Sequence, residues 1–139
     1  MAKLFKLSVL TPEREFFNGD AEAVTLTAPD GLLTILADHT PFIMPVIAGS
    51  LRIKKNGAWD ESSNAEGFVE VNRQGVMVCV QACEHPEEID MRRAEEALRR
   101  AEERLRQKRS IGEYNQSKLA LARAMARLRI TKSSINLKE

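Results

Sequence analysis

The pattern of apolar and polar positions changes at His85-Pro86. Before this point, short runs alternate apolar and polar residues and are separated by Gly, Pro and Asn, which is typical of half-buried strands joined by turns. Asn56-Gly57 is a strong signal for a hairpin turn. These runs lie at residues 24–28, 32–36, 51–54, 68–71 and 76–80. They predict an antiparallel β-sandwich, or flattened barrel, over residues 1–85 with a core of its own.

After residue 86 the apolar positions follow the period of an α-helix, with Asp90 as a suitable N-cap. In the first run they recur at spacings of three and four residues, at Met91, Ala94, Leu98, Ala101 and Leu105. A second run, from about residue 113 to 129 or slightly beyond, repeats these spacings at Tyr114, Ser117, Leu121, Ala124 and Leu128. Two matched seams joined by a short loop predict an antiparallel two-helix hairpin over residues 86–139. The predicted fold class is therefore α+β.

The two helical seams contain Ala and Ser as often as Leu. Small side chains bury little apolar area, so we expect contacts that hold the hairpin only marginally. A helix pair that can open is the prediction, and an ordinary stable hairpin is the alternative that composition leaves open.

Length and composition fit one small globular domain with an appendage, since the chain has 139 residues and is 43% hydrophobic. It contains no apolar run long enough to cross a bilayer, and its first residues lack the pattern of a signal peptide. We therefore expect a cytoplasmic protein without direct membrane insertion, which could still dock on a membrane complex.

Cys79 and Cys83 fall in a strand-like run, where residues four apart are too distant to form a disulfide easily. A metal site built from both thiols and His85 fits no common zinc spacing. We expect buried, reduced thiols and no metal site.

Charge is distributed unevenly around a formal net charge of +1. Residues 1–84 carry seven Lys/Arg against eleven Asp/Glu, a net −4, whereas residues 85–139 carry fourteen against nine, a net +5. A basic last helix predicts an acidic partner surface, a phosphate ligand or a nucleic acid.

Four arginines of the helical half could converge near the β half. Arg93 and Arg100 are two turns apart on the first helix, and Arg123 and Arg127 are one turn apart on the second. Antiparallel pairing brings the start of the first helix near the end of the second, and guanidinium groups match phosphate geometry. The alternative is a solvated basic face.

The β half offers no catalytic constellation that we can defend. Asp38-His39 resembles an acid–base pair, but no nucleophile with an evident partner can be placed beside it. The following apolar segment, residues 42–47, is either a core strand or an exposed contact patch, and periodicity favours the core strand.

Along its whole length the chain resembles the epsilon subunit family of F-type ATP synthase. In the β half the resemblance rests on residues 31–41 (GLLTILADHTP), 49–53 (GSLRI) and 67–71 (GFVEV), with Ala37 where the family usually has Pro. In the helical half it rests on residues 89–94 (IDMRRA), which look like the family's ATP-binding signature. The resemblance implies a sandwich followed by a helical hairpin, as the periodicity also predicts.

The resemblance also implies the site residues. The implied ATP-binding residues are Glu84, Ile89, Asp90, Arg93, Ala94, Arg100, Arg123 and Arg127. The arginines would bind phosphates, while Glu84, Ile89 and Asp90 would surround the base. Leu32, Asp38 and His39 are the implied contacts with the c-ring.

For function, the resemblance implies a non-catalytic rotor subunit of the central stalk, peripheral to the cytoplasmic face of a bacterial cell membrane. The sandwich would bind the gamma subunit and the c-ring and help couple proton flow to ATP synthesis. The arm would inhibit ATP hydrolysis when extended toward the beta subunits, and bound ATP would favour the folded arm. ATP is thus the expected regulatory ligand, no catalytic cofactor is expected, and a role for magnesium stays open.

Two alternatives remain beside this reading. One is the same subunit without ATP sensing, in which the arginines serve only an acidic partner. The other is a free-standing β-sandwich module with a basic hairpin for nucleic acid. Only 5% of residues are aromatic, and Tyr114 alone lies among the basic residues of the second helix, so stacking of bases is disfavoured. We therefore expect no nucleic-acid partner.

Overall fold

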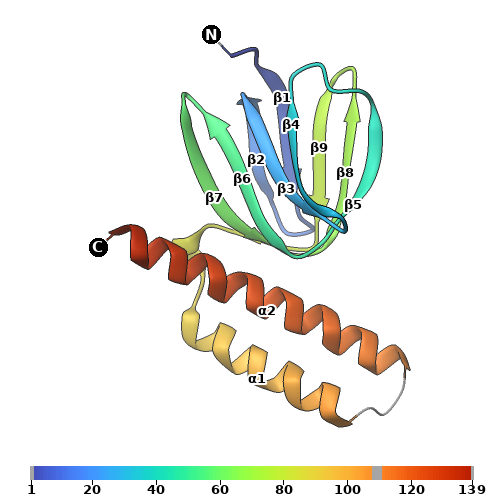
Figure 1. Cartoon of the computed structure of the whole chain (residues 1–139), viewed down its shortest axis with the longest axis vertical. Coiled ribbons are helices and arrows are strands. Elements are labelled where there is room, and N and C mark those ends of the chain that lie inside the picture. The colour runs from blue at the N-terminus through green and yellow to red at the C-terminus, as the bar shows by residue number, and fades with distance from the viewer. Residues whose placement is uncertain (1, 108–110, 139) are drawn as a thin grey trace.

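The computed structural model describes residues 2–107 and 111–138, which form a two-sheet β-sandwich with a pair of helices across one end (Figure 1). The strands are β1 (Phe5–Leu10), β2 (Glu15–Ala21), β3 (Ala23–Ala28), β4 (Gly31–Leu36), β5 (Phe42–Val46), β6 (Gly49–Lys55), β7 (Ala58–Asn64), β8 (Gly67–Asn72), β9 (Gly75–Val80) and β10 (Cys83–Glu84). A 3₁₀ helix, η1 (Pro86–Glu88), leads into α1 (Met91–Gln107) and α2 (Ile111–Lys138). The predicted fold class is confirmed.

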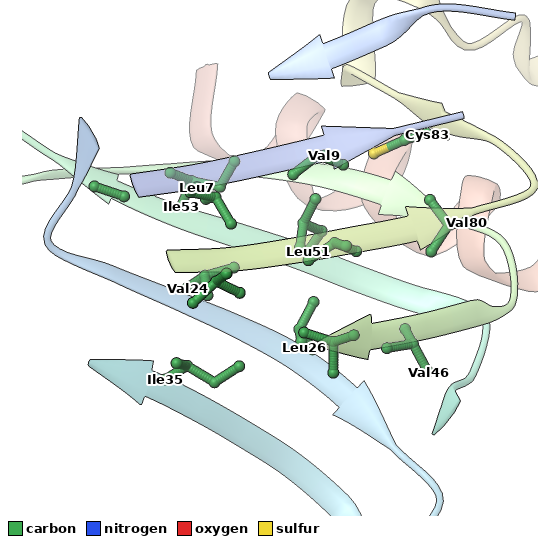
Figure 2. Close-up of a cluster of buried hydrophobic side chains, with 14 of the residues drawn as sticks. Leu7, Val9, Val24, Leu26, Ile35, Val46, Leu51, Ile53, Val80 and Cys83 are labelled. Carbon is green, nitrogen blue, oxygen red and sulfur yellow. The ribbon is translucent and has the colours of Figure 1, made fainter. Parts of the chain in front are cut away.

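The two sheets have five strands each, in the orders β2-β1-β9-β8-β5 and β10-β7-β6-β3-β4. Inward-facing apolar side chains of nine strands, all except β7, fill the space between the sheets (Figure 2). Leu7, Val24, Leu51 and Val78 are fully buried there. Among the described residues, this core cluster draws on residues 5–83 and includes no side chain of α1 or α2.

Local turn signals are confirmed, whereas one strand pairing was not predictable. Asn56 and Gly57 have φ values of 54° and 77° and connect β6 to β7, as a tight hairpin requires. The first strand, however, pairs with β9 in parallel, between Leu7–Leu10 and Val76–Cys79. Parallel pairing joins segments distant in sequence, and alternation of side chains does not reveal it.

The segment between the sheets also corrects the placement of the cysteines. Cys79 lies on β9 of one sheet and Cys83 on β10 of the other, because the chain crosses between sheets in residues 81–82. Both thiols are free, and only Cys83 is fully buried. Burial is the main cause that raises the pKa of Cys83, to about 11.

The predicted core strand of residues 42–47 is an edge strand, β5. Val46 is buried and Phe42 and Met44 pack against the core, but Ile43 is 71% exposed. One face of β5 is therefore part of the core and the other is exposed, so both alternatives from the sequence hold for the same strand.

The helices form the predicted hairpin, and α2 lies between the sandwich and α1 (Figure 1). The small seam residues Ala94, Ala101, Ser117 and Ala124 are buried, so the helices approach closely. Tyr114 is 39% exposed, and the buried seam of α2 starts after it. The predicted extension of that helix beyond residue 129 reaches Lys138, since no Pro or Gly follows to end it. No helix among the described residues is long and apolar enough to cross a membrane.

Candidate functional site

A cavity of about 210 Å³ lies where β10, the hinge after it and both helices meet. It is lined by Glu84, Glu88, Ile89, Asp90, Arg93, Ala94, Ala97, Arg100 and Arg127. Seven of the eight residues expected to bind ATP thus surround one space, and the eighth, Arg123, does not line it.

Local structure explains how α1 presents its residues to the cavity. Asp90 caps the helix, since its Oδ1 accepts a hydrogen bond from the Arg93 N–H at 3.2 Å. Arg93 and Arg100 are seven residues apart and therefore project from the same side. Ala94 and Ala97, between them, leave room for the cavity because their side chains are short.

The remaining wall comes from the sandwich and from α2. Glu84 belongs to β10, opposite Ser63 of β7. Its Oε1 accepts hydrogen bonds from Nε of Arg127 at 2.8 Å, and Nη2 of the same guanidinium lies 2.7 Å away. This ion pair joins α2 to the edge of the sandwich across the cavity.

A second ion pair fixes the hinge itself. Arg14, in the β1–β2 connection, pairs with Glu88 at 2.5 Å and donates to the Cys83 carbonyl at 3.0 Å. Its guanidinium lies over the Phe16 ring, which packs against His85 with the ring centroids 4.5 Å apart. Both ends of residues 83–88 are therefore held to the sandwich.

The charges that line the cavity are not balanced by pairing. Glu84 and Glu88 are engaged by Arg127 and Arg14, and Asp90 caps α1. Among the side chains that the structure describes (residues 2–106, 112 and 114–132), Arg93 and Arg100 have no ion-pair partner. Two guanidinium groups that face one cavity without a carboxylate partner suit an anionic ligand.

The cavity is smaller than the roughly 300–1,000 Å³ typical of small-molecule pockets. A phosphate group fits, whereas a whole nucleotide would extend beyond it. A neighbouring cavity of about 430 Å³ shares Glu84, Glu88 and Arg127 with the first and adds Arg14. A larger ligand that extends from the small cavity into this one would meet Arg14 but also Glu13, so the neighbouring cavity carries both signs of charge.

The predicted convergence of four arginines is correct for three of them. Arg123 instead pairs with Glu66, in the β7–β8 connection: its Nε donates to Oε2 at 2.8 Å and its Nη2 donates to Oε1. Sequence reasoning missed two cavity residues that flank the signature: Glu88, directly before it, and Ala97, one turn after Ala94. It had no signal for Arg14 or Glu66, which lie far away in the sequence.

The three residues expected at the c-ring do not form one cluster. Asp38 and His39 lie in the β4–β5 loop, at the end of the sandwich opposite the helices, where Asp38 pairs with Lys3 at 2.5 Å (Figure 1). Leu32 is 68% exposed at the other end of β4. In the part of the chain that the structure describes, no cluster of His, Cys, Asp or Glu could hold a metal ion.

Comparison with known proteins gives matches along almost the whole chain. The family described as "ATP synthase, Delta/Epsilon chain, beta-sandwich domain" matches residues 4–86, and "ATP synthase, Delta/Epsilon chain, long alpha-helix domain" matches residues 87–132. An ATP synthase epsilon chain of Caldanaerobacter subterraneus subsp. tengcongensis is 50% identical over 94% of this chain and 95% of its own length. That of Ruminiclostridium cellulolyticum is 49% identical over 91% and 95%.

Two solved structures share the fold. A chain of the Euglena gracilis mitochondrial ATP synthase has a TM-score of 0.74 at 21% identity, over 95% of this chain and 81% of its own. A chain from the central stalk and c-ring of the Tetrahymena thermophila enzyme has a TM-score of 0.63 at 13% identity, over 94% and 98%.

Proposed function

The chain belongs to the ATP synthase delta/epsilon family, as an epsilon chain, and from this we propose a non-catalytic central-stalk subunit whose folded arm is stabilised by ATP. Extended toward the beta subunits, the arm inhibits ATP hydrolysis. The subunit helps couple proton flow to ATP synthesis at the cytoplasmic face of a bacterial membrane, which it does not enter.

The observation that carries ATP sensing is the cavity with two arginines, Arg93 and Arg100, that lack a carboxylate partner among the described residues. These arginines bind the phosphates. Ile89 and Ala94, both buried, offer apolar contact for the base. The proposed site uses side chains only, and the ATP that it holds is a regulatory ligand.

The cavity is shared between the sandwich and the arm, and this is how ATP favours one arm position. Glu84 and Glu88 belong to the part held by Arg14, whereas Arg93, Arg100 and Arg127 belong to the helices. An extended arm separates these groups, so ATP binds the folded state. A ligand at 100 times its dissociation constant stabilises the state that binds it by about 2.7 kcal/mol.

The pivot of the arm lies at Ile89–Asp90. The preceding residues are fixed through Arg14 and by hydrogen bonds from the N–H groups of Glu88 and Ile89 to the carbonyls of His85 and Pro86. Ile89 has extended backbone angles, φ −83° and ψ 122°, between η1 and the cap of α1. Rotation there moves both helices and leaves β10 in place.

The proposed partners use three separate surfaces. The gamma subunit docks on the outer face of the sheet that contains β5, β8 and β9, where Ile43 and Phe68 are 71% and 42% exposed. The c-ring meets the loop with Asp38 and His39. The beta subunits meet α2, whose described exposed face includes Lys118, Arg129 and Lys132.

Calorimetric titration of the purified chain with ATP tests the site. We expect saturable binding that Arg100→Ala weakens at least tenfold, because a hydrogen bond to a charged group contributes about 1.5–3 kcal/mol. Arg99→Ala is the matched control, since Arg99 is also exposed on the same helix but does not line the cavity.

An absence of saturable heat, or equal losses in both variants, would refute ATP sensing. The same subunit without ATP sensing would then stand. It still predicts that removal of the arm relieves inhibition of ATP hydrolysis in the assembled complex.

A further inference from the structure

Arg123 of α2 forms an ion pair with the sandwich outside the cavity. The guanidinium of Arg123 binds both carboxylate oxygens of Glu66, through Nε and Nη2. The side chains of Arg123 and Glu66 are 39% and 24% exposed, so the pair is partly shielded from water. Two parallel hydrogen bonds make this contact more specific in geometry than a single point contact.

The backbone that carries Glu66 is held in place. The N–H of Ala65 donates to the Ala82 carbonyl at 2.9 Å, and the N–H of Gln81 donates to the Glu66 carbonyl at 3.0 Å. Gly67 lies so close to the neighbouring strand that an added Cβ would be 1.9 Å from the Cys79 carbonyl oxygen. The carboxylate is therefore presented from a rigid connection, and pairing costs little additional ordering.

Arg123 and Arg127 form two contacts one helical turn apart, and they differ in their relation to the cavity. Arg127 lines it, so a phosphate ligand competes with Glu84 for this guanidinium. Arg123 does not line it, and both carboxylate oxygens of Glu66 already engage its guanidinium.

We propose that Arg123 is a positioning residue and not a ligand-binding one: with Glu66 it latches α2 to the sandwich and so sets the affinity of the cavity for phosphate-bearing ligands. The effect on affinity rests on the proposed ATP site, whereas the latch itself is a property of the ligand-free chain.

Each member of the Arg123–Glu66 pair stabilises the charged form of the other. The Arg123 guanidinium holds the pKa of Glu66 below its ordinary value, and hydrogen bonding to Glu66 raises the pKa of Arg123. Both groups are therefore charged across the neutral range.

A buried position beneath α2 reports latch opening. Ser63 is 4% exposed on β7, and because its neighbour Ser62 faces the core, against Cys83, Ser63 faces the helix side. In a Cys79→Ser background, a thiol at Ser63→Cys reacts with a maleimide only when α2 lifts, so its labelling rate is proportional to the undocked fraction.

We expect Glu66→Gln and Arg123→Ala each to raise this ligand-free rate about fivefold, the upper end for a partly exposed ion pair. The double variant should match the single ones, because each breaks the same contact. Charge reversal, Glu66→Arg with Arg123→Glu, should restore most of the protection. Glu70→Gln, on the outer face of β8, is the matched control and should change nothing.

Titration with ATP distinguishes a latch from a phosphate ligand, because the two roles of Arg123 predict different effects of Glu66→Gln on ATP affinity. A latch predicts that Glu66→Gln weakens ATP binding as much as Arg123→Ala, because both favour the undocked arm. If Arg123 bound phosphate, Glu66→Gln would release it for the ligand and leave affinity unchanged or higher, which would overturn the proposal.

Failure of the two proposals can be told apart. A wild-type chain that binds no ATP refutes the ATP site, and the latch is then judged by ligand-free labelling alone. Labelling that Glu66→Gln leaves unchanged refutes the latch, even in a chain that binds ATP.

Discussion

Deletion of the arm tests whether the sandwich is an independent folding unit. A chain of residues 1–88 keeps every member of the core cluster and the ion pair of Arg14 with Glu88. It loses the contacts that α2 makes with the sandwich, which include the ion pairs of Arg123 with Glu66 and of Arg127 with Glu84 as well as the buried Ile130. We therefore expect it to fold and to unfold cooperatively.

The size of the loss follows from these contacts. A partly exposed ion pair contributes at most about 1 kcal/mol, so the two together contribute about 2 kcal/mol. For a domain of this length, 1 kcal/mol shifts the melting temperature by about 4–8 °C, which gives a decrease of about 8–16 °C. Leu51→Ala in the same truncated chain should cost more, about 2–5 kcal/mol, because Leu51 is fully buried in the core.

Thermal and urea unfolding, followed by near-ultraviolet circular dichroism and by the single tryptophan, measure both effects. A truncated chain without a cooperative transition would show that the arm is part of the folding unit. It would also refute the proposal that the arm can move away while the sandwich stays folded.

Three further predictions concern the arm and the thiols. Ile130→Ala, at a helix position that is 2% exposed and lines a cavity with sandwich residues, should raise the undocked fraction about tenfold in the labelling assay. It should also lower the melting temperature of the sandwich, but by no more than deletion of the arm does, since the core is intact. Cys79 should react with maleimide before Cys83, whose burial raises its pKa to about 11; mass spectrometry of the native chain should find Cys83 unmodified at pH 7. Because Arg123 lowers the pKa of Glu66, the ion pair should be fully formed above the ordinary pKa of 4.5 and be lost as pH falls through the lowered pKa. Acid should therefore undock α2 in part by protonating Glu66, and Glu66→Gln should remove this pH dependence, measured by tryptophan quenching.

The features that sequence predicted correctly depend on neighbours within about one helical turn or one hairpin. Asn56-Gly57 determines a turn by itself, and Asp90 caps the helix that follows it. Arg93 and Arg100 share a helix face because of their spacing alone. Local geometry of this kind is contained in a short window of sequence.

The features that sequence missed depend on contacts between distant segments. Glu66 and Arg123 are 57 residues apart, and Arg14 and Glu88 are 74 residues apart. No periodicity connects residues at such separations, and only the completed sandwich places them together. The family resemblance grouped Arg123 with the cavity, and the geometry of the pair with Glu66 separates them.

The ion pairs of Arg14 and Arg123 also explain why the boundary in sequence composition and the proposed pivot of the arm lie at different residues. The sequence changes character at His85-Pro86, but Arg14 holds residues 83–88 to the sandwich, so the first free rotation comes at Ile89. A ligand in the cavity spans that rotation and restrains the start of α1, while Arg123 restrains α2 about two turns before Ile130. Two restraints on different helices resist the same movement, so loss of either should weaken docking without abolishing it.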